Sequence, residues 1–196
     1  MMKKVLNVGG NSKDIPLPSF YAGWEHILLD IDPTTGADVI CDARELRQRA
    51  PAEFDSIHCS HNLEHYFAHD VRKVLAGFRH VLRPEGFVFL RVPDIGQVAQ
   101  AMVTRKLDID DVLYVSPAGP ILVKDVLYGW GAQIEASGVD FFAHKTGFTP
   151  KSLANALAVA GFGPVYIGTQ EHEVQAFAFV QPPDATTRAL LGLPPA

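Results

Sequence analysis

Short apolar runs recur along the first half of the chain, separated by polar or loop-like segments. The runs Val5 to Val8, Ile27 to Ile31 and Phe54 to Cys59 have the length of buried strands. A further run, residues 37–41, lies between the second and the last of these and is a possible third strand in chain order. It follows the second strand after only a few residues, which is short for a parallel crossover. Prolines and a glycine at 16, 18 and 23 predict a loop with one short helical turn between the first two strands.

The segment from residue 69 to residue 94 has the clearest periodicity. Its apolar positions lie three and four apart and form one helical stripe: Val71, Val74, Leu75, Phe78, Val81 and Leu82. The helix is expected to end at Arg83-Pro84-Glu85-Gly86, a sequence suited to a type I turn. A buried strand from Phe87 to Val92 should follow, so this segment and the preceding run Phe54 to Cys59 together form a strand, helix, strand unit.

The second half predicts an interrupted continuation of the same alternation. Residues 95–106 look helical, and residues 108–147 contain prolines and glycines that suggest an insertion covering a site. Thr149 and Pro150 favour the start of a helix that ends at Gly161. Two final strands are expected at 165–168 and 174–180. The prediction is an α/β fold: a three-layer, Rossmann-like sandwich with a mostly parallel sheet and an antiparallel edge.

Composition narrows the classes of partner. The 196 residues are 47% apolar, which predicts one globular domain, and 22 acidic against 17 basic residues give a net charge of −5. That charge argues against a nucleic acid or an anionic membrane as partner. No apolar stretch approaches membrane-spanning length and none suits a signal peptide, so we expect a cytoplasmic protein. Cys41 and Cys59 should be small hydrophobic residues rather than a disulfide.

Polar residues follow the predicted strands at their carboxyl ends, where ligands bind in such sheets. Asp30, after the second strand, is placed to accept hydrogen bonds from a ribose diol, and Asp42, after the third, from an adenine amine. The loop Gly9-Gly10-Asn11 opens no helix that could face a pyrophosphate. The site therefore suits a nucleoside without phosphates, which disfavours a nicotinamide-dependent, sugar-modifying enzyme.

Five motifs follow one another along the chain: Leu6-Asn7-Val8-Gly9-Gly10, Leu29-Asp30-Ile31-Asp32, Cys41-Asp42-Ala43, Phe54-Asp55 through His61-Asn62-Leu63-Glu64-His65, and Val81-Leu82-Arg83-Pro84-Glu85-Gly86. Their order resembles that of the class I S-adenosylmethionine-dependent methyltransferases. The chain looks most like a small bacterial group of predicted, type 11-like methyltransferases. In that group a histidine precedes Lys-Thr-Gly-Phe, here His144 to Phe148, which extends the resemblance to residue 180.

The resemblance implies S-adenosylmethionine as cofactor, with S-adenosylhomocysteine as product. Gly9 and Gly10 would lie against its methionine part, Asp30 would hold the ribose, and Asp42 would lie beside the adenine. Ser60 and His61 would flank the sulfonium, and the predicted cofactor set also includes Asn11, Ile31 and Ala43. The family loop usually has glycine, any residue, glycine; because asparagine tolerates positive φ, Asn11 predicts a bent loop here.

Three histidines are candidates for catalytic proton handling: His61, His65 and His144. His65 alternatively caps a helix or packs in the core, and His144 alternatively lies on the surface. His61 to His65 also spells an inverted zinc-protease pattern, which requires a helix on both sides of its ligands. Because His61 leaves a predicted strand, we expect no metal there.

The resulting prediction is a single methyltransferase domain over residues 1–181, with an insertion at about 95–147 and a proline-rich tail at 182–196 that is either mobile or latched onto a groove. It would transfer a methyl group to a small-molecule acceptor by in-line displacement. A homodimer is compatible with this interpretation. The alternative is a non-catalytic binding or scaffolding protein of the same fold. Five aromatic residues could form a lid, but for most of them we expect the core of the insertion: Tyr114, Tyr128, Trp130, Phe141 and Phe142.

Overall fold

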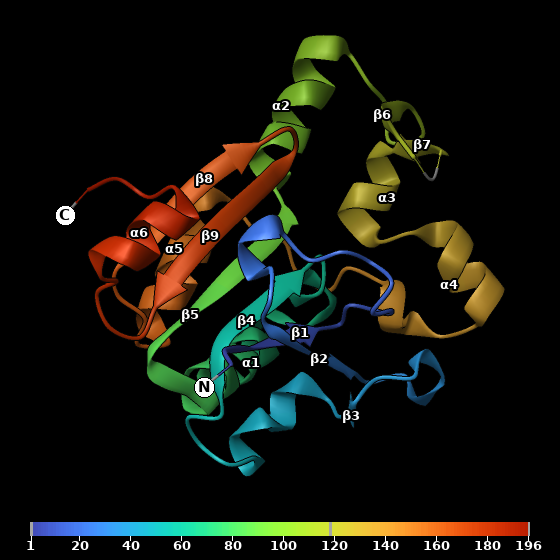
Figure 1. Ribbon diagram of the computed structural model, residues 1–196. Helices are drawn as coiled ribbons and strands as arrows, with labels where there is room; N and C mark the ends of the chain where they lie inside the picture. The colour runs from blue at the N-terminus through green and yellow to red at the C-terminus, as the bar shows by residue number, and fades with distance from the viewer. Residues whose placement is uncertain (1, 118, 196) are drawn as a thin grey trace.

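A seven-stranded sheet with the order β3-β2-β1-β4-β5-β9-β8 forms the centre of the molecule (Figure 1). The computed structural model describes residues 2–117 and 119–195. The strands of this sheet are β1 (Lys4–Val8), β2 (Glu25–Asp30), β3 (Val39–Ile40), β4 (Phe54–Ser60), β5 (Leu82–Pro93), β8 (Val165–Gln170) and β9 (Glu173–Phe179). The first five are parallel, whereas β9 runs antiparallel to both β5 and β8. The predicted α/β sheet is confirmed. It includes the possible strand at residues 37–41, of which Val39–Ile40 form β3.

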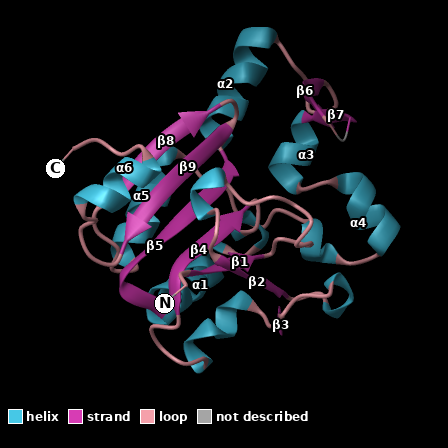
Figure 2. Ribbon diagram, in the orientation of Figure 1, coloured by secondary structure: helices cyan, strands magenta, loops and turns pink. Residues whose placement is uncertain are grey.

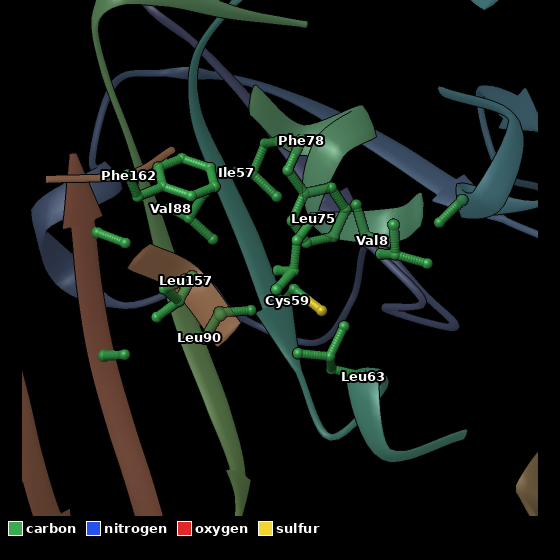
Figure 3. Close-up of a cluster of buried hydrophobic side chains, with 14 of the residues drawn as sticks. Val8, Ile57, Cys59, Leu63, Leu75, Phe78, Val88, Leu90, Leu157 and Phe162 are labelled. Carbon is green, nitrogen blue, oxygen red and sulfur yellow. The ribbon is translucent and has the colours of Figure 1, made fainter. Parts of the chain in front are cut away.

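One face of the sheet carries the larger apolar core. Helices α1 (Ala68–Val81) and α5 (Pro150–Val159) pack on it together with a 3-10 helix, Ala43–Gln48. Figure 3 shows side chains from α1, including Leu75 and Phe78, meeting those of the central strands. Thr149 caps α5 through its side chain, as the sequence predicts.

The opposite face is covered by less regular structure. The connection after β1 contains one 3-10 turn, Ser19–Tyr21, which confirms the predicted crossover loop. Helix α6 (Ala185–Leu191) lies on the same face and belongs to the predicted tail, residues 182–196. Its Leu191 is buried in an apolar cluster with Phe87 and Phe179. Most of this end of the chain is therefore ordered against the sheet.

The segment after β5 extends away from the sheet and returns beside the carboxyl ends of its strands (Figure 2). It comprises α2 (Ile95–Arg105), the hairpin β6 (Val112–Ser116) and β7 (Gly119–Leu122), α3 (Val123–Tyr128) and α4 (Gly131–Ser137). Its small core is aliphatic, built around Val98, Leu113 and Val123. The expectation that most aromatic residues form this core is wrong, since Tyr128 is 62% exposed and Trp130 47%.

One local prediction also needs correction. Residues 83–86 do not form a separate turn between helix and strand, because β5 begins directly at Leu82. Pairing with β4 passes from Leu82–Phe54 to Phe87–Ser56, so the four intervening residues bulge out of an otherwise continuous strand. The Arg83 guanidinium anchors this bulge by an ion pair with Asp55. Among the described residues, no helix has the length and apolar character needed to cross a membrane.

Candidate functional site

A cavity of about 280 Å³ lies where the carboxyl ends of β1, β2 and β4 meet the insertion; we call it the first cavity. Six of the predicted cofactor residues line it: Gly9, Asn11, Asp30, Ile31, Asp42 and His61. The candidate His65 lines it too, and Phe141, Phe142 and Lys145 of the insertion complete one wall. Of the described residues, Gly10, Ala43 and Ser60 stand outside this wall, so any contact they make with a ligand stays a prediction.

The loop after β1 has the bend that the sequence predicts. Gly9 and Asn11 both have positive φ, +69° and +59°. A Cβ atom on Gly9 would collide with the side chain of Asn62, so glycine allows the close approach of these two residues. Gly10 instead packs against the side chain of Asn7. The loop therefore brings bare backbone, rather than side chains, to the cavity.

Asp30 organises the floor of the first cavity. Its carboxylate accepts hydrogen bonds from the backbone N–H of Asn11 (3.2 Å) and of Asp32 (3.0 Å), and the residue is 9% exposed. A carboxylate has about four lone-pair positions, so acceptor capacity remains toward the cavity. This is the capacity that a ribose diol requires.

Asp42 is held by a charge network that the sequence analysis did not predict. Its carboxylate accepts from the backbone N–H of Arg44 (2.9 Å) and from the Arg44 Nε (2.8 Å). The Arg44 Nη1 also reaches Oδ2 of Asp70, at 3.3 Å. Burial opposes the charge on Asp42, but the bonds from Arg44 hold the pKa of its carboxyl below the usual value. Asp42 is therefore a fixed carboxylate, with part of its acceptor capacity already used.

His61 lies at the boundary between the first cavity and a second one. Its Nε2 is 2.9 Å from Oε2 of Glu173, and its Nδ1 is 3.5 Å from Oε1 of Glu64. Burial works against protonation of His61, but the two carboxylates outweigh it and raise its pKa to about 9. Near neutral pH His61 is therefore an imidazolium, which does not suit it to the role of general base.

The second cavity has a volume of about 420 Å³ and lies between the sheet and the insertion. His61, Arg91, Glu173, Tyr114, Trp130 and His144 are among the residues lining it. Arg91 makes a two-pronged ion pair with Glu173, with N–O distances of 3.0 and 2.8 Å. Burial opposes the charge on Glu173, but the hydrogen bond from His61 and the ion pair with Arg91 hold its pKa at about 2, so this carboxylate stays charged.

The two remaining candidate histidines meet beside Glu64. The rings of His65 and His144 are 4.9 Å apart, and His144 Nε2 is 4.0 Å from Oε1 of Glu64. His144 Nδ1 lies 2.9 Å from the carbonyl oxygen of Val126, which fixes the N–H on Nδ1 and leaves a lone pair on Nε2. Burial lowers the pKa of His144 in spite of the nearby carboxylate, so its ring is neutral. His144 is 12% exposed at its side chain, so the surface alternative for it is excluded.

Sequence reasoning missed Arg44, Glu64 and Glu173 as parts of the site. An aspartate at the N-cap position, two residues before Arg44, is a sequence signal that could have revealed the ion pair between Asp42 and Arg44. Glu64 was considered only as part of a zinc-protease pattern. Glu173 begins the last strand, 112 residues after His61, and nothing in its local sequence indicates that contact.

Comparison with known proteins gives one family match. Residues 23–90 match the family model described as "Methyltransferase domain". A search of curated proteins found no match.

Solved structures resemble the chain over most of its length. A SAM dependent methyltransferase from Archaeoglobus fulgidus is 14% identical, with 90% of this chain and 86% of that chain covered and a TM-score of 0.57. The 1,6-didemethyltoxoflavin-N1-methyltransferase of Burkholderia thailandensis, solved with bound 1,6-didemethyltoxoflavin and S-adenosylhomocysteine, is 19% identical over 90% of this chain and 71% of its own, with a TM-score of 0.53. A possible histamine N-methyltransferase from Thermotoga maritima is 11% identical over 92% and 84%, with a TM-score of 0.56. At these identities the structures establish a shared fold.

Proposed function

We propose that this chain, a class I S-adenosylmethionine-dependent methyltransferase by its fold and by its methyltransferase-domain match, transfers the methyl group to a small molecule held in the second cavity. The observation that carries the proposal is the position of His61, which lines both cavities. A donor in the first cavity and an acceptor in the second would meet at this residue. The methyltransferase from Burkholderia, solved with a small-molecule ligand, makes such an acceptor plausible by analogy.

The residues of the first cavity fit the cofactor. Asp30 would receive the ribose hydroxyls, Asp42 would lie beside the adenine, and the Gly9 backbone would approach the methionine part. Arg44 already donates to both oxygens of Asp42, from its backbone N–H to Oδ1 and from its guanidinium to Oδ2, so an adenine amine would share this carboxylate with Arg44. When bound, the cofactor supplies an activated methyl group that an acceptor atom takes in one in-line displacement, leaving S-adenosylhomocysteine.

The chain's own residues would align the acceptor and receive its proton. Tyr114 and Trp130 offer aromatic surfaces in the second cavity, and Arg91 with Glu173 offers fixed charges for a polar acceptor. Because His61 is cationic, we assign it a fixed charge at the boundary rather than proton transfer. A proton lost by a hydroxyl or amine acceptor would leave toward the cluster of Glu64, His65 and His144.

The proposal extends to partners and location. A net charge of −5 supports a small acceptor over a nucleic acid or an anionic membrane. A cytoplasmic location, a homodimer and the division into residues 1–181 and a tail remain predictions of the sequence analysis.

Calorimetric titration with S-adenosylmethionine and S-adenosylhomocysteine tests the cofactor half of the proposal. The variant Asp30→Ala should bind both more than tenfold more weakly, a loss on the order of 1.5 to 3 kcal/mol, because two hydroxyls lose a charged acceptor. Asp14→Ala, in the exposed loop that follows β1, is the matched control and should bind normally. Unchanged affinity in Asp30→Ala would place the ribose elsewhere.

Transfer of a labelled methyl group tests the acceptor half. Incubation with pools of small metabolites should label a compound in the low-molecular-weight fraction, and the rate of labelling should fall by about 100-fold in Glu173→Gln. Binding of the cofactor without turnover on any acceptor would favour the alternative of a non-catalytic binding protein.

A further inference from the structure

Glu64 is a buried, charged residue whose side chain has no hydrogen bond. It is 1% exposed, and neither oxygen of its carboxylate accepts a hydrogen bond. The nearest imidazole nitrogens are His61 Nδ1 at 3.5 Å and His144 Nε2 at 4.0 Å. A buried carboxylate that lacks hydrogen bonds costs several kcal/mol unless a positive charge compensates it. His61 lies 3.5 Å from Glu64 but shares its positive charge with Glu173, and neither Glu64 oxygen has a hydrogen-bond donor, so both oxygens remain open to a further ligand.

His144 presents a free lone pair to this carboxylate. Its Nδ1–H donates to the carbonyl oxygen of Val126, which orients the ring and leaves Nε2 unprotonated. A backbone carbonyl that receives the second N–H is the usual support of a metal-binding histidine. His144 is thus oriented as a ligand before any ion arrives.

His65 provides the third donor. Its two ring nitrogens each lie 3.1 Å from a carbonyl oxygen, Nδ1 from Ala143 and Nε2 from His61. An ion could take the place of one of these carbonyl oxygens while the other nitrogen keeps its hydrogen bond, so His65 can supply one ligand atom.

We propose that Glu64, His65 and His144 bind one divalent transition-metal ion of the Zn²⁺ type. One donor atom from each residue falls within a group whose members all lie within 4.8 Å of one another, so small side-chain movements bring them to ligand distances. Two imidazoles and one carboxylate are the donor set of zinc sites that keep a coordination position open.

The proposed site differs from the pattern that the sequence suggests. The zinc-protease pattern would pair His61 with His65 on one helix, but His61 turns away to Glu173. The second histidine comes instead from the insertion, where the backbone N–H of Lys145 donates to the carbonyl oxygen of Glu64 and holds the two segments together. An ion here would lie between the first cavity, lined by His65, and the second, lined by His144.

Only the consequence for catalysis rests on the proposed function, and in the metal-bound protein Glu64, His65 and His144 would be ligands rather than the proton acceptors described above. If the acceptor occupies the second cavity, the open coordination position would bind an acceptor oxygen or nitrogen and fix it near the boundary. Affinity for the ion itself requires nothing of the cofactor or the acceptor.

The test uses the full chain, treated with a chelator and then titrated with Zn²⁺ in competition with a chromogenic chelator. Wild type should bind one ion per chain, and His144→Ala should bind it at least ~100-fold more weakly, since even outer partners of ligands contribute 10- to 100-fold. His69→Ala, an exposed histidine outside the cluster, is the matched control and should bind like wild type. Co²⁺ should give the visible absorption of a four-coordinate site in wild type and not in His144→Ala.

Two results would overturn the proposal: no stoichiometric ion in wild type, or equal affinity in wild type and His144→Ala. The first would mean that protonated histidines alone compensate Glu64. Far-UV circular dichroism checks that His144→Ala is folded, and His65→Ala provides a second variant. Titration of the same samples with S-adenosylhomocysteine separates the two ideas, because cofactor binding without Zn²⁺ binding contradicts only the metal site, and the reverse contradicts only the cofactor site.

Discussion

The two cavities are built in different ways although they share His61. In the first, the key carboxylates accept hydrogen bonds from residues two positions along the chain, as Asp30 does from Asp32 and Asp42 from Arg44. In the second, Glu173 is joined to residues 82 and 112 positions away, Arg91 and His61. The first cavity, proposed for the cofactor, thus depends on local turn geometry, and the second, proposed for the acceptor, on how the last strands and the insertion pack. Changes to one cavity should leave the other largely intact.

The largest effect on activity is expected from breaking the long-range contacts of Glu173 in the second cavity. Glu173→Gln removes the charge that holds both Arg91 and His61, so acceptor and donor would lose alignment. We expect kcat/KM for methyl transfer to fall by about 100-fold, the order of loss produced by misplacing reacting groups by ~1 Å. The Kd for S-adenosylhomocysteine should change less than threefold, as measured by calorimetry.

Glu171→Gln is the control for that experiment. It removes a carboxylate from the wall of the same cavity but not from the ion pairs with Arg91 and His61. An equal loss of activity in the two variants would show that net charge, rather than positioning, matters in the second cavity.

A complementary change should affect only the first cavity. Gly9→Ala forces a positive φ on alanine and places its Cβ atom against the Asn62 side chain. We expect cofactor affinity to fall about tenfold or more. Gly23→Ala carries the same type of φ strain in open space, so it should lose stability without losing affinity. Equal affinities in the two variants would show that the loop after β1 does not touch the cofactor.

A smaller effect, on the pH dependence of stability, should distinguish His58 inside β4 from His61 just after its end. His58 on β4 is 6% exposed, and burial lowers its pKa to about 4. Below its ordinary pKa of 6.5 the unfolded chain takes up the proton more readily, so His58 should cost about 1 kcal/mol of stability between pH 7 and pH 5.5. Urea unfolding of His58→Phe should show a flatter pH dependence over this range. The same slope in both proteins would contradict the assignment.

His61, three residues further along, should have the opposite dependence. Its pKa is raised to about 9, so the stability from its contacts with Glu173 and Glu64 is fully present below pH 6.5. That stability should be lost as pH rises through 9, by less than the His58 effect because the side chain is half exposed to solvent. Unfolding of His61→Gln should lack the alkaline loss. If wild type and variant lose stability in parallel above pH 7, His61 is not paired as described.

The contrast between the cavities also explains what the sequence could predict. Apolar runs and turn residues are local signals, and they identified the strands, the positive φ of Asn11 and the positions of Asp30 and His61 at strand ends. The partner of His61 depends on where β9 enters the sheet, which no local pattern specifies. Glu64 shows the same limit, because its neighbours His144 and Lys145 come from a segment about 80 residues further along the chain. The exposed aromatic residues were misjudged for a related reason, since aliphatic residues of α2 and α3 already fill the core of the insertion.

A crystal structure with S-adenosylhomocysteine bound tests the central claim most directly. The account predicts the ribose at Asp30, the adenine beside Asp42 and the sulfur directed toward His61 at the boundary with the second cavity. Density for the ligand in another part of the molecule, or a sulfur directed away from His61, would contradict it.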